Sequence, residues 1–317
     1  MQNKKRPDSS EFACLAPNFG GKTESMTVSS PPQGTPLAAN ASHEPKPARD
    51  ISPGCRRTVV LTGASGGIGI LIARRLLDQN YRVIALCRSK PAIESELLSH
   101  IACDLGASGS LAEACSRIHE HHAPVFAVIH CAGTISPSFM ATADEKDITT
   151  QISLNLSAPI LLTRHLLPLM QTIDGRQKSC IVFVNSMAAV MPLAGSAVYA
   201  AAKAGLRSFA LSLAQEARPR GILVSSVFPG AVQTDMLIRE MKEGGSVLNY
   251  VSTPLDPDVV AKAVTDQLIR CGSERFLPAI DGVFGRLCML APCLLRLSLP
   301  LLRFIGKRGY LRTKTRL

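Results

Sequence analysis

The sequence predicts an α/β fold, a single Rossmann-type domain in which helices cover both faces of a doubly wound parallel sheet. Two observations predict it. Short apolar runs without polar alternation, typical of parallel strands buried on both faces, alternate along the chain with longer helical patterns. A glycine-rich turn also joins the first of these runs to the first helical pattern. We expect the domain to span residues 53–282, between a disordered leader at 1–52 and a tail at 283–317.

The predicted elements follow one another in a regular order. The predicted strands are the runs TVVLT (58–62), RVIALC (82–87), HIAC (100–103), VFAVIHC (125–131), CIVFVNS (180–186) and ILVSSVF (222–228). Helical patterns cover residues 67–80, 144–171, 196–218 and 256–270, and a further polar helix ends before Pro124. Residues 187–195 and 236–255 have the composition of apolar, flexible loops.

The leader contains seven prolines within residues 1–50 and shows no sustained apolar periodicity, so we expect disorder there, with Met26 as an alternative start. No apolar stretch of signal-peptide length follows the N-terminus. The ten cysteines lack paired spacing, and most lie in apolar runs, as Cys87, Cys103 and Cys180 do. These features favour a cytoplasmic, reducing location.

The positive charge of the chain is concentrated in the tail. Residues 1–50 carry six basic and five acidic side chains, and residues 283–317 carry eight basic and no acidic ones. Of the formal net charge of +11, only +2 therefore belongs to residues 51–282. A nearly neutral domain is not typical of a nucleic-acid-binding protein. The histidines at 119, 121 and 122 end a polar helix, where cations suit the C-terminus, and no cysteine or carboxylate completes a metal site with them, so we predict no metal.

The glycine-rich turn, TGASGGIG at 62–69, has the position at which a dinucleotide pyrophosphate meets the N-terminus of a helix. Gly63 permits the tight turn, Gly67 lets backbone N–H groups approach the phosphates, and Gly69 lets the helix pack closely. Ser65 and Ile68 belong to the same predicted cofactor site. The alternative is an ordinary flexible loop.

The second predicted strand ends in ALCRS, where a cofactor without a 2′-phosphate usually meets an acidic side chain. This chain has Arg88 instead, and a guanidinium matches a phosphate in charge and geometry. We therefore predict NADP(H) rather than NAD(H). The alternative is a solvated charge on an ordinary loop.

The stretch YAAAK places Tyr199 and Lys203 one helical turn apart on the same face of a helix. Alone, the pair could be a solvated surface pair. Together with the glycine turn and the order of the elements, it resembles the short-chain dehydrogenase/reductase family, over roughly residues 57–235. The resemblance implies that residues 53–282 form a catalytic domain, similar to that of the 3-oxoacyl reductases.

The resemblance also implies cofactor contacts at the ends of several strands. Asp104 matches the acid that contacts the adenine ring. Pro229 matches the Pro-Gly turn of the family, and Thr234, five residues further on, matches the residue that contacts the nicotinamide carboxamide. In HCAG, Ala132 and Gly133 are the small residues that are needed beside the cofactor. His130 and Cys131 replace the two asparagines of the family, which leaves open how the sheet is braced there. We expect His130 to be a satisfied core or pocket-rim group.

The catalytic set implied by the resemblance is Asn155, Ser186, Tyr199 and Lys203. Tyr199 exchanges the proton with the substrate oxygen, which Ser186 holds. An ordinary tyrosine has a pKa of about 10. We expect the charge of Lys203, with that of the oxidised nicotinamide, to lower the pKa of Tyr199. Asn155 anchors a water that links Lys203 to solvent.

We therefore expect an NADP(H)-dependent oxidoreductase that interconverts a carbonyl and a secondary alcohol. The apolar segments 187–195 and 236–255 favour a hydrophobic or acyl substrate. The alternatives are a non-catalytic NADP(H)-binding regulator and a membrane-surface scaffold. A homo-oligomer is a further expectation.

The tail departs from the short C-terminal ending of the family. Residues 287–305 have the length of a short transmembrane helix, yet Arg296 lies at the centre, and we expect Pro292 and Pro300 to break the helix. One interpretation is a helix packed on the substrate pocket or on a second subunit. The other is an interfacial segment that makes the protein peripheral on a membrane, whose basic side chains meet anionic lipid: Arg296, Arg303, Lys307, Arg308, Arg312, Lys314 and Arg316.

Overall fold

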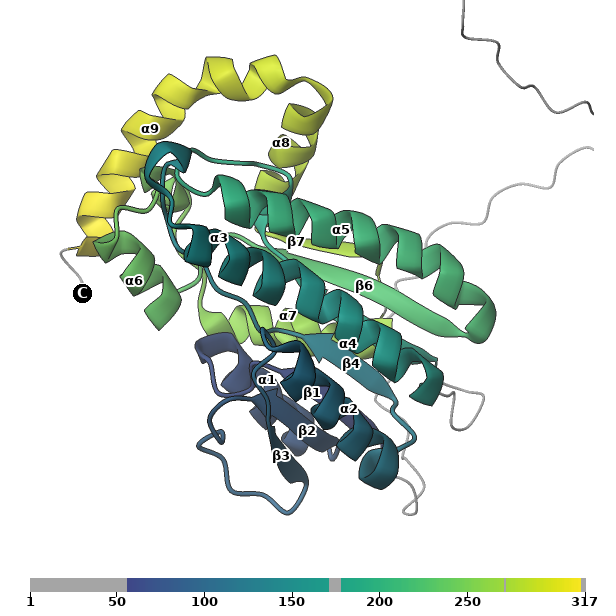
Figure 1. Ribbon diagram of the computed structural model, residues 1–317. Helices are drawn as coiled ribbons and strands as arrows, with labels where there is room; N and C mark the ends of the chain where they lie inside the picture. The colour runs from purple at the N-terminus through teal and green to yellow at the C-terminus, as the bar shows by residue number, and fades with distance from the viewer. Residues whose placement is uncertain (1–55, 171–177, 271, 315–317) are drawn as a thin grey trace, which may run out of the picture. The chain divides into compact units, whose positions relative to one another are not determined.

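The computed structural model describes residues 56–170, 178–270 and 272–314. The predicted leader at 1–52, with Met26, and Arg316 of the tail lie outside these ranges. The described residues form one parallel sheet with helices on both faces, as predicted (Figure 1). The strands are β1 (Thr58–Thr62), β2 (Arg82–Cys87), β3 (Leu98–Ala102), β4 (Ala127–His130), β5 (Ser179–Val184), β6 (Ile222–Pro229) and β7 (Glu274–Leu277).

The strand order is β3-β2-β1-β4-β5-β6-β7, and all neighbouring pairs are parallel. β1 therefore pairs with β2 on one side and with β4 on the other, so the direction of winding reverses at β1. In such sheets ligands bind outside the carboxyl ends of the strands at this switch point. The six predicted strands are confirmed. β7 was missed because its sequence, ERFL, is short and half charged.

Helices pack on each face through separate apolar clusters. α1 (Gly67–Asp78) and α7 (Pro257–Arg270) share one cluster, in which Ile72 and Leu76 meet Val260 and Val264 beneath alternate residues of the strands. The other face is covered by α2 (Ser108–His122), α4 (Ala158–Leu166) and α5 (Ala197–Ala217). The strands are buried on both sides, which explains their lack of polar alternation.

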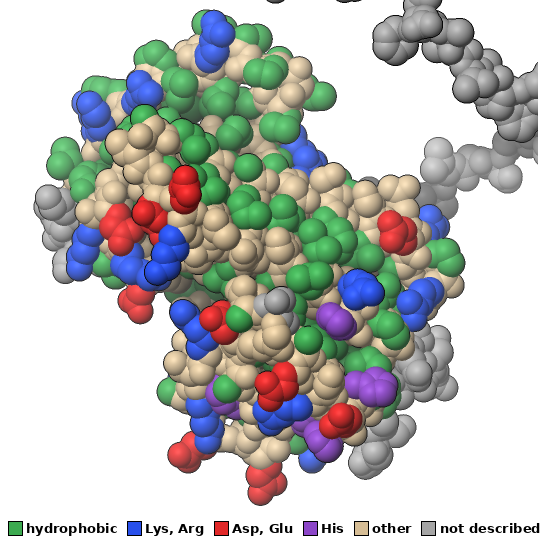
Figure 2. Space-filling view, in the orientation of Figure 1, with side chains coloured by type: hydrophobic (Ala, Val, Ile, Leu, Met, Phe, Trp, Pro, Cys, Tyr) green, Lys and Arg blue, Asp and Glu red, His purple; other side chains and the backbone are tan. Residues whose placement is uncertain are grey.

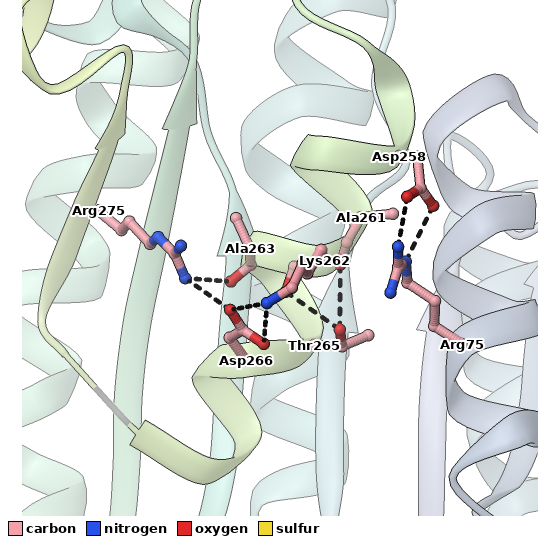
Figure 3. A network of polar contacts seen from close by, with 8 residues as sticks. All are labelled: Arg75, Asp258, Ala261, Lys262, Ala263, Thr265, Asp266 and Arg275. Carbon is pink, nitrogen blue, oxygen red and sulfur yellow. Dashed lines mark hydrogen bonds and ion pairs between the residues drawn. The ribbon is translucent and has the colours of Figure 1, made fainter. Parts of the chain in front are cut away.

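Ion pairs connect α7 to the elements on either side of it (Figure 3). The Nε of Arg75 on α1 donates to Asp258 at a distance of 3.0 Å. Further along α7, Asp266 accepts from Arg275 of β7 at 3.2 Å and from Lys262 at 3.1 Å. These contacts link the edge strand β7, from which the C-terminal helices emerge, to the main body of the domain.

The predicted helix at 144–171 consists of several parts. It contains α3 (Glu145–Ile152), one π-helical turn η2 (Ser153–Ser157), α4 and a 3₁₀ turn η3 (Leu167–Leu169). We expected the segment 236–255 to be a flexible loop, and this expectation is wrong. Most of this segment forms α6 (Asp235–Lys242) and the 3₁₀ turn η6 (Val247–Tyr250).

The tail forms two helices, α8 (Ala279–Leu290) and α9 (Pro292–Lys314). α8 runs through residue 283, at which we expected the tail to begin. The expectation that Pro300 breaks the helix is wrong, because α9 continues through it. Pro292 instead opens α9, where its missing N–H costs no helical hydrogen bond. Among the described residues, no helix is both long enough and apolar enough to cross a membrane.

α9 packs closely on η6. Side-chain atoms at Gly306 and Gly309 would collide with the backbone of Val247 and Tyr250, so only glycine permits this approach. The Tyr310 ring meets the Tyr250 ring edge to face, with centroids 5.4 Å apart. The interpretation of the tail as a helix packed near the substrate segment therefore holds for the inner face of α9.

Candidate active site

The predicted site residues gather at the carboxyl ends of the strands. Gly63 follows β1, Arg88 follows β2, Asp104 lies beyond β3, and Ser186 lies beyond β5. In a parallel sheet these ends share one edge, so residues far apart in sequence meet there. α5 crosses the same region and adds Tyr199 and Lys203.

The glycine turn is compact because two of its glycines are in close contact with backbone. Gly63 has a φ of +70°, and a Cβ there would lie 2.8 Å from the Cα of Ala132. A Cβ at Gly69 would collide with the carbonyl oxygen of Gly63. The first turn of α1 therefore packs directly on the end of β1, as predicted. Gly67 faces the side chain of Thr234, which brings two predicted cofactor residues together.

The phenol and ammonium of the YAAAK stretch lie on the inner side of α5. Lys203 is buried, and its Nζ donates to the carbonyl oxygen of Val184 at 3.0 Å. The same Nζ lies 5.7 Å from the centre of the Tyr199 ring. The alternative of a solvated surface pair is therefore wrong.

Ser186 stands beside Tyr199 at the end of β5. Its hydroxyl accepts a hydrogen bond from the N–H of Ala188 at 3.1 Å, and its proximity acts to lower the pKa of the Tyr199 phenol. The preceding residue, Asn185, is buried and accepts from the N–H of Ser186 at 2.9 Å. Within the described part of the chain, the Nδ2 of Asn185 has no hydrogen-bond partner.

Asn155 lies fully buried in the π-helical turn that joins α3 to α4. Its Nδ2 donates to the carbonyl oxygens of Thr134 and Gln151 at 2.7 and 2.9 Å, and its Oδ1 accepts from the N–H of Thr134 at 3.1 Å. A Cβ at Gly133 would lie 2.8 Å from this Oδ1 and 3.7 Å from the Nζ of Lys203. Asn155 and Lys203 therefore flank the same glycine.

The hydroxyl of Thr62 takes the place of a bracing side chain at the end of β4. It accepts hydrogen bonds from the N–H groups of Cys131 and Ala132, each at 3.0 Å. His130 is a satisfied core residue: its ring stacks on Phe183 with centroids 4.7 Å apart, and its Nε2 lies 2.9 Å from the Thr163 hydroxyl. Sequence reasoning missed Thr62, although it begins the glycine-turn motif.

A cavity of about 340 Å³ opens in front of Tyr199. Of the predicted residues, those that line it are Ile68, Gly133, Ser186, Tyr199, Lys203, Pro229 and Thr234. Both segments that we expected to form the substrate site contribute to it, through Met187 and Met191 and through Leu237 and Leu248. α8 and α9 add Phe284 and Leu302, which sequence reasoning missed.

Some predicted residues lie away from this cavity. Arg88 and Asp104 are both exposed, and neither is among the described residues that line it. The Oδ1 of Asp104 accepts from the N–H of Gly106 at 3.0 Å. The N–H of Gly63 donates to the carbonyl oxygen of Leu86 at 3.0 Å, so the glycine turn adjoins the end of β2, after which Arg88 follows.

Burial dominates the proton affinities of the pair on α5. Burial raises the pKa of Tyr199 to about 12. Ser186 acts to lower this pKa, and the charge of the nearby Glu240 acts to raise it. In the protein without cofactor, Lys203 is therefore not among the groups that shift the pKa of Tyr199, and the expected lowering in the presence of oxidised nicotinamide stays a prediction. Burial also lowers the pKa of Lys203, to about 8.

Glu240 of α6 is a polar group in the cavity wall that sequence reasoning missed. Burial raises its pKa, and its Oε1 accepts from the Nδ2 of Asn249 at 2.6 Å. On the opposite side of the same wall, the Asp281 carboxylate accepts from the Ser252 hydroxyl at 2.9 Å. No signal in the sequence distinguishes these carboxylates from solvated ones.

Known proteins resemble this chain. The family model described as short chain dehydrogenase matches residues 57–244. Protein FixR of Bradyrhizobium diazoefficiens is 34% identical over 233 residues, covering 68% of this chain and 81% of FixR. The 3-oxoacyl-[acyl-carrier-protein] reductase MabA of Mycobacterium avium is 29% identical over 180 residues, covering 57% of this chain and 69% of MabA.

Among solved structures, a short-chain dehydrogenase from Sphingobium yanoikuyae in complex with NADPH is 25% identical, with a TM-score of 0.61. The alignment covers 74% of this chain and 95% of that one. The sequence matches, the shared parallel sheet and the position of the cavity at the carboxyl edge of the strands all indicate the same kind of site. The chain therefore belongs to the short-chain dehydrogenase family and is an oxidoreductase that interconverts a carbonyl and an alcohol with a nicotinamide cofactor.

Proposed function

We propose that this protein is an NADP(H)-dependent reductase of hydrophobic or acyl carbonyl compounds, or the corresponding alcohol dehydrogenase, in which Tyr199 exchanges the proton. The observation that carries the proposal is that Ser186, Tyr199 and Lys203 line the same cavity. Asn155 adjoins this set, because its Oδ1 and the Nζ of Lys203 both lie close to Gly133.

The proton affinities suit Tyr199 to the role of acid. With a pKa raised to about 12, its phenol keeps its proton at neutral pH and can give it to a substrate oxygen. The nearby Ser186, which acts to lower this pKa, stabilises the phenolate that remains. Lys203, with a pKa of about 8, holds and releases a proton near neutral pH and is suited to return one to Tyr199. When bound, the nicotinamide supplies the hydride in reduction or takes it up in oxidation.

The residues at this edge fit a nicotinamide cofactor. Gly63 and Gly69 have no room for a Cβ, so the turn at the start of α1 consists of closely packed backbone. The first turn of α1 contains no acidic residue that would repel a phosphate. The buried Nδ2 of Asn185, which lacks a partner within the described residues, lines the adjoining cavity and can donate to a ligand. We propose that the cofactor is held by Gly63, Ser65, Gly67, Ile68, Gly69, Asp104, Ala132, Gly133, Tyr199, Lys203, Pro229 and Thr234.

NADP(H) is the proposed form of the cofactor. Arg88 is exposed directly after β2, beside the glycine turn, so its guanidinium is free to meet a 2′-phosphate. NAD(H) is the less favoured cofactor.

The cavity lining supports a hydrophobic substrate. Its walls carry methionine, leucine, isoleucine and phenylalanine side chains from six separate segments. The likeness to a 3-oxoacyl reductase supports acyl compounds among the candidates. Glu240 and its partner Asn249 would suit a hydroxyl or amide group of such a substrate.

The other proposals concern assembly and domain limits. We propose that the leader covers residues 1–52, the catalytic domain residues 53–282 and the tail residues 283–317. We also propose that the protein forms a homo-oligomer and that its tail associates peripherally with a membrane. A non-catalytic NADP(H)-binding regulator is not favoured, because the catalytic pattern is complete and Ser186, Tyr199 and Lys203 meet at one cavity.

A substrate panel tests the proposed function. The purified full chain is mixed with NADPH and with ketones, aldehydes and acyl thioesters of increasing chain length, and the loss of NADPH absorbance is followed. We expect turnover that rises with chain length. If no member of the panel is reduced while NADPH binds, the proposal is wrong and the regulator takes its place.

A further inference from the structure

The outer faces of α8 and α9 carry a continuous set of exposed apolar side chains. On α8, Ile280, Val283, Leu287 and Leu290 follow one another at helical spacings of three and four residues, and Leu290 is 84% exposed. On α9 the same pattern continues with Leu294, Leu297, Leu301 and Ile305, and Leu297 is 77% exposed. We call these eight residues the outer stripe.

The outer stripe is exposed along its length, and Ile280 at its start also lines the catalytic cavity. The opposite face of α9 makes the contacts with η6, through Gly306, Gly309 and Tyr310. On α8, Gly282 and Cys288 are the buried positions. Large exposed apolar patches on a folded domain mark sites of interaction with a partner or a membrane.

Exposed basic side chains lie on α9, the helix that carries half of the outer stripe. Arg296, Arg303 and Lys307 follow one another on α9 at spacings of seven and four residues, which places them on one side of the helix. We call them the basic row. All three are exposed, and within the described ranges none forms an ion pair with a carboxylate. Figure 2 shows hydrophobic and basic side chains gathered over the part of the molecule that α8 and α9 occupy in Figure 1.

We propose that the outer stripe and the basic row bind the surface of an anionic phospholipid bilayer, with α8 and α9 lying in the interface. Apolar side chains enter the boundary between headgroups and acyl chains, while arginine and lysine meet lipid phosphates. The described helices include none that could cross a membrane, so the binding is peripheral.

The charge distribution favours a bilayer over a second copy of the chain. In a two-fold dimer the same patch faces itself, so each basic row would approach its own copy. Residues 283–317 contain no acidic side chain to offset this repulsion. An anionic bilayer supplies the complementary charge instead.

The proposal extends to the substrate route, and this part rests on the proposed function. Phe284 and Leu302 line the catalytic cavity from α8 and α9, the same helices that carry the outer stripe. A bilayer bound to these helices therefore lies one helix thickness from the cavity. Lipid-like carbonyl compounds dissolved in that bilayer are the substrate class we infer.

The absence of tryptophan from the chain allows a direct test. A single tryptophan is introduced as Leu297→Trp in the outer stripe, and a matched one as Ile269→Trp on α7, where the native side chain is 65% exposed. Vesicles of phosphatidylcholine with phosphatidylserine are added to each full-length variant. We expect a blue shift of the emission, and quenching by brominated lipid, at position 297 and not at 269.

Charge reversal tests the basic row in the same assay. Arg296→Glu, Arg303→Glu and Lys307→Glu are combined in the Leu297→Trp chain, and the control combines Arg74→Glu, Arg82→Glu and Arg117→Glu, which are exposed on α1, β2 and α2. We expect the first set to weaken vesicle binding about tenfold or more and the control set to leave it nearly unchanged. Thermal unfolding of each variant checks that it is folded.

Several results would overturn the proposal. One is no spectral change at position 297, and another is an equal change at 269. Equal weakening by both charge sets would also overturn it. Self-association that is lost in Leu290→Asp, without vesicle binding by the parent chain, would assign the outer stripe to a second copy. Vesicle binding without turnover of any lipid-like carbonyl would retain the membrane surface and reject the substrate route.

Discussion

The Nζ of Lys203 donates to the carbonyl oxygen of Val184 and lies 5.7 Å from the centre of the Tyr199 ring. The ammonium is therefore fixed by the end of β5 and not by the phenol. Removal of the Tyr199 hydroxyl leaves this anchor intact, so the contributions of the two residues can be separated by experiment.

Tyr199→Phe should lower the rate of carbonyl reduction on the order of 10²–10⁴-fold, because the variant keeps the ring and loses only the acid. The NADPH dissociation constant should stay nearly unchanged. Steady-state kinetics and fluorescence titration with NADPH measure the two effects. Tyr250→Phe is the matched control, because its buried hydroxyl has no hydrogen-bond partner within the described residues. Reduction by Tyr199→Phe at the parent rate would contradict the mechanism.

Arg88→Asp should weaken NADPH binding far more than NADH binding. The substitution removes the proposed partner of the 2′-phosphate and places a carboxylate where it can accept from ribose hydroxyls. The ratio of the two dissociation constants is the measurement, and it should change by tenfold or more. Arg74→Asp, an equal charge change on the exposed side of α1, should leave the ratio unaltered. An equal loss of both cofactors in Arg88→Asp would show that Arg88 does not meet the phosphate.

Glu240→Gln should move the pH dependence of alcohol oxidation to lower pH. The charge of Glu240 raises the pKa of Tyr199, because loss of the phenol proton places a second negative charge nearby. Without that charge the phenolate forms at lower pH, so the rising limb of kcat against pH shifts downward. Glu243→Gln, at the exposed end of α6, is the control and should leave the limb in place. A rising limb that stays fixed in Glu240→Gln would remove Glu240 from the titration of Tyr199.

Thr62→Val should destabilise the fold by about 1–3 kcal/mol, because it leaves the N–H groups of Cys131 and Ala132 without their acceptor. Chemical denaturation gives the change in the free energy of unfolding. Thr62→Ser keeps the hydroxyl oxygen and should recover most of the loss. Equal stability of Thr62→Val and the parent chain would mean that these two hydrogen bonds do not brace the sheet.

The sequence was sufficient to predict six of the seven strands of the sheet and the residues at its carboxyl edge. Apolar strand runs, the glycine turn and the spacing of Tyr199 and Lys203 all depend on short-range periodicity, which a sequence displays directly. The same local patterns could not reveal the π-helical turn around Asn155, since it differs from an ordinary helical turn only in its hydrogen bonding.

The remaining differences depend on contacts between distant segments. The direction of the Tyr199 pKa shift depends on burial and on Glu240, neither of which is visible from a four-residue spacing. Pro300 remains inside α9, although a proline in the interior of a helix usually breaks or kinks it. The bracing role of Thr62 could not be predicted, because its partners lie about 70 residues further along the chain.

The close fit of Gly306 and Gly309 against η6 limits how substrate preference can be transferred between related proteins. The segment that lines the cavity at 246–255 and the C-terminal helix meet without room for any side chain at these two positions. A chimera that takes only one of the two segments from a relative would leave either a collision or a gap in the cavity wall. We expect the two segments to be exchangeable only as a pair, so that the specificity of this enzyme is a property of two sequence regions that must change together.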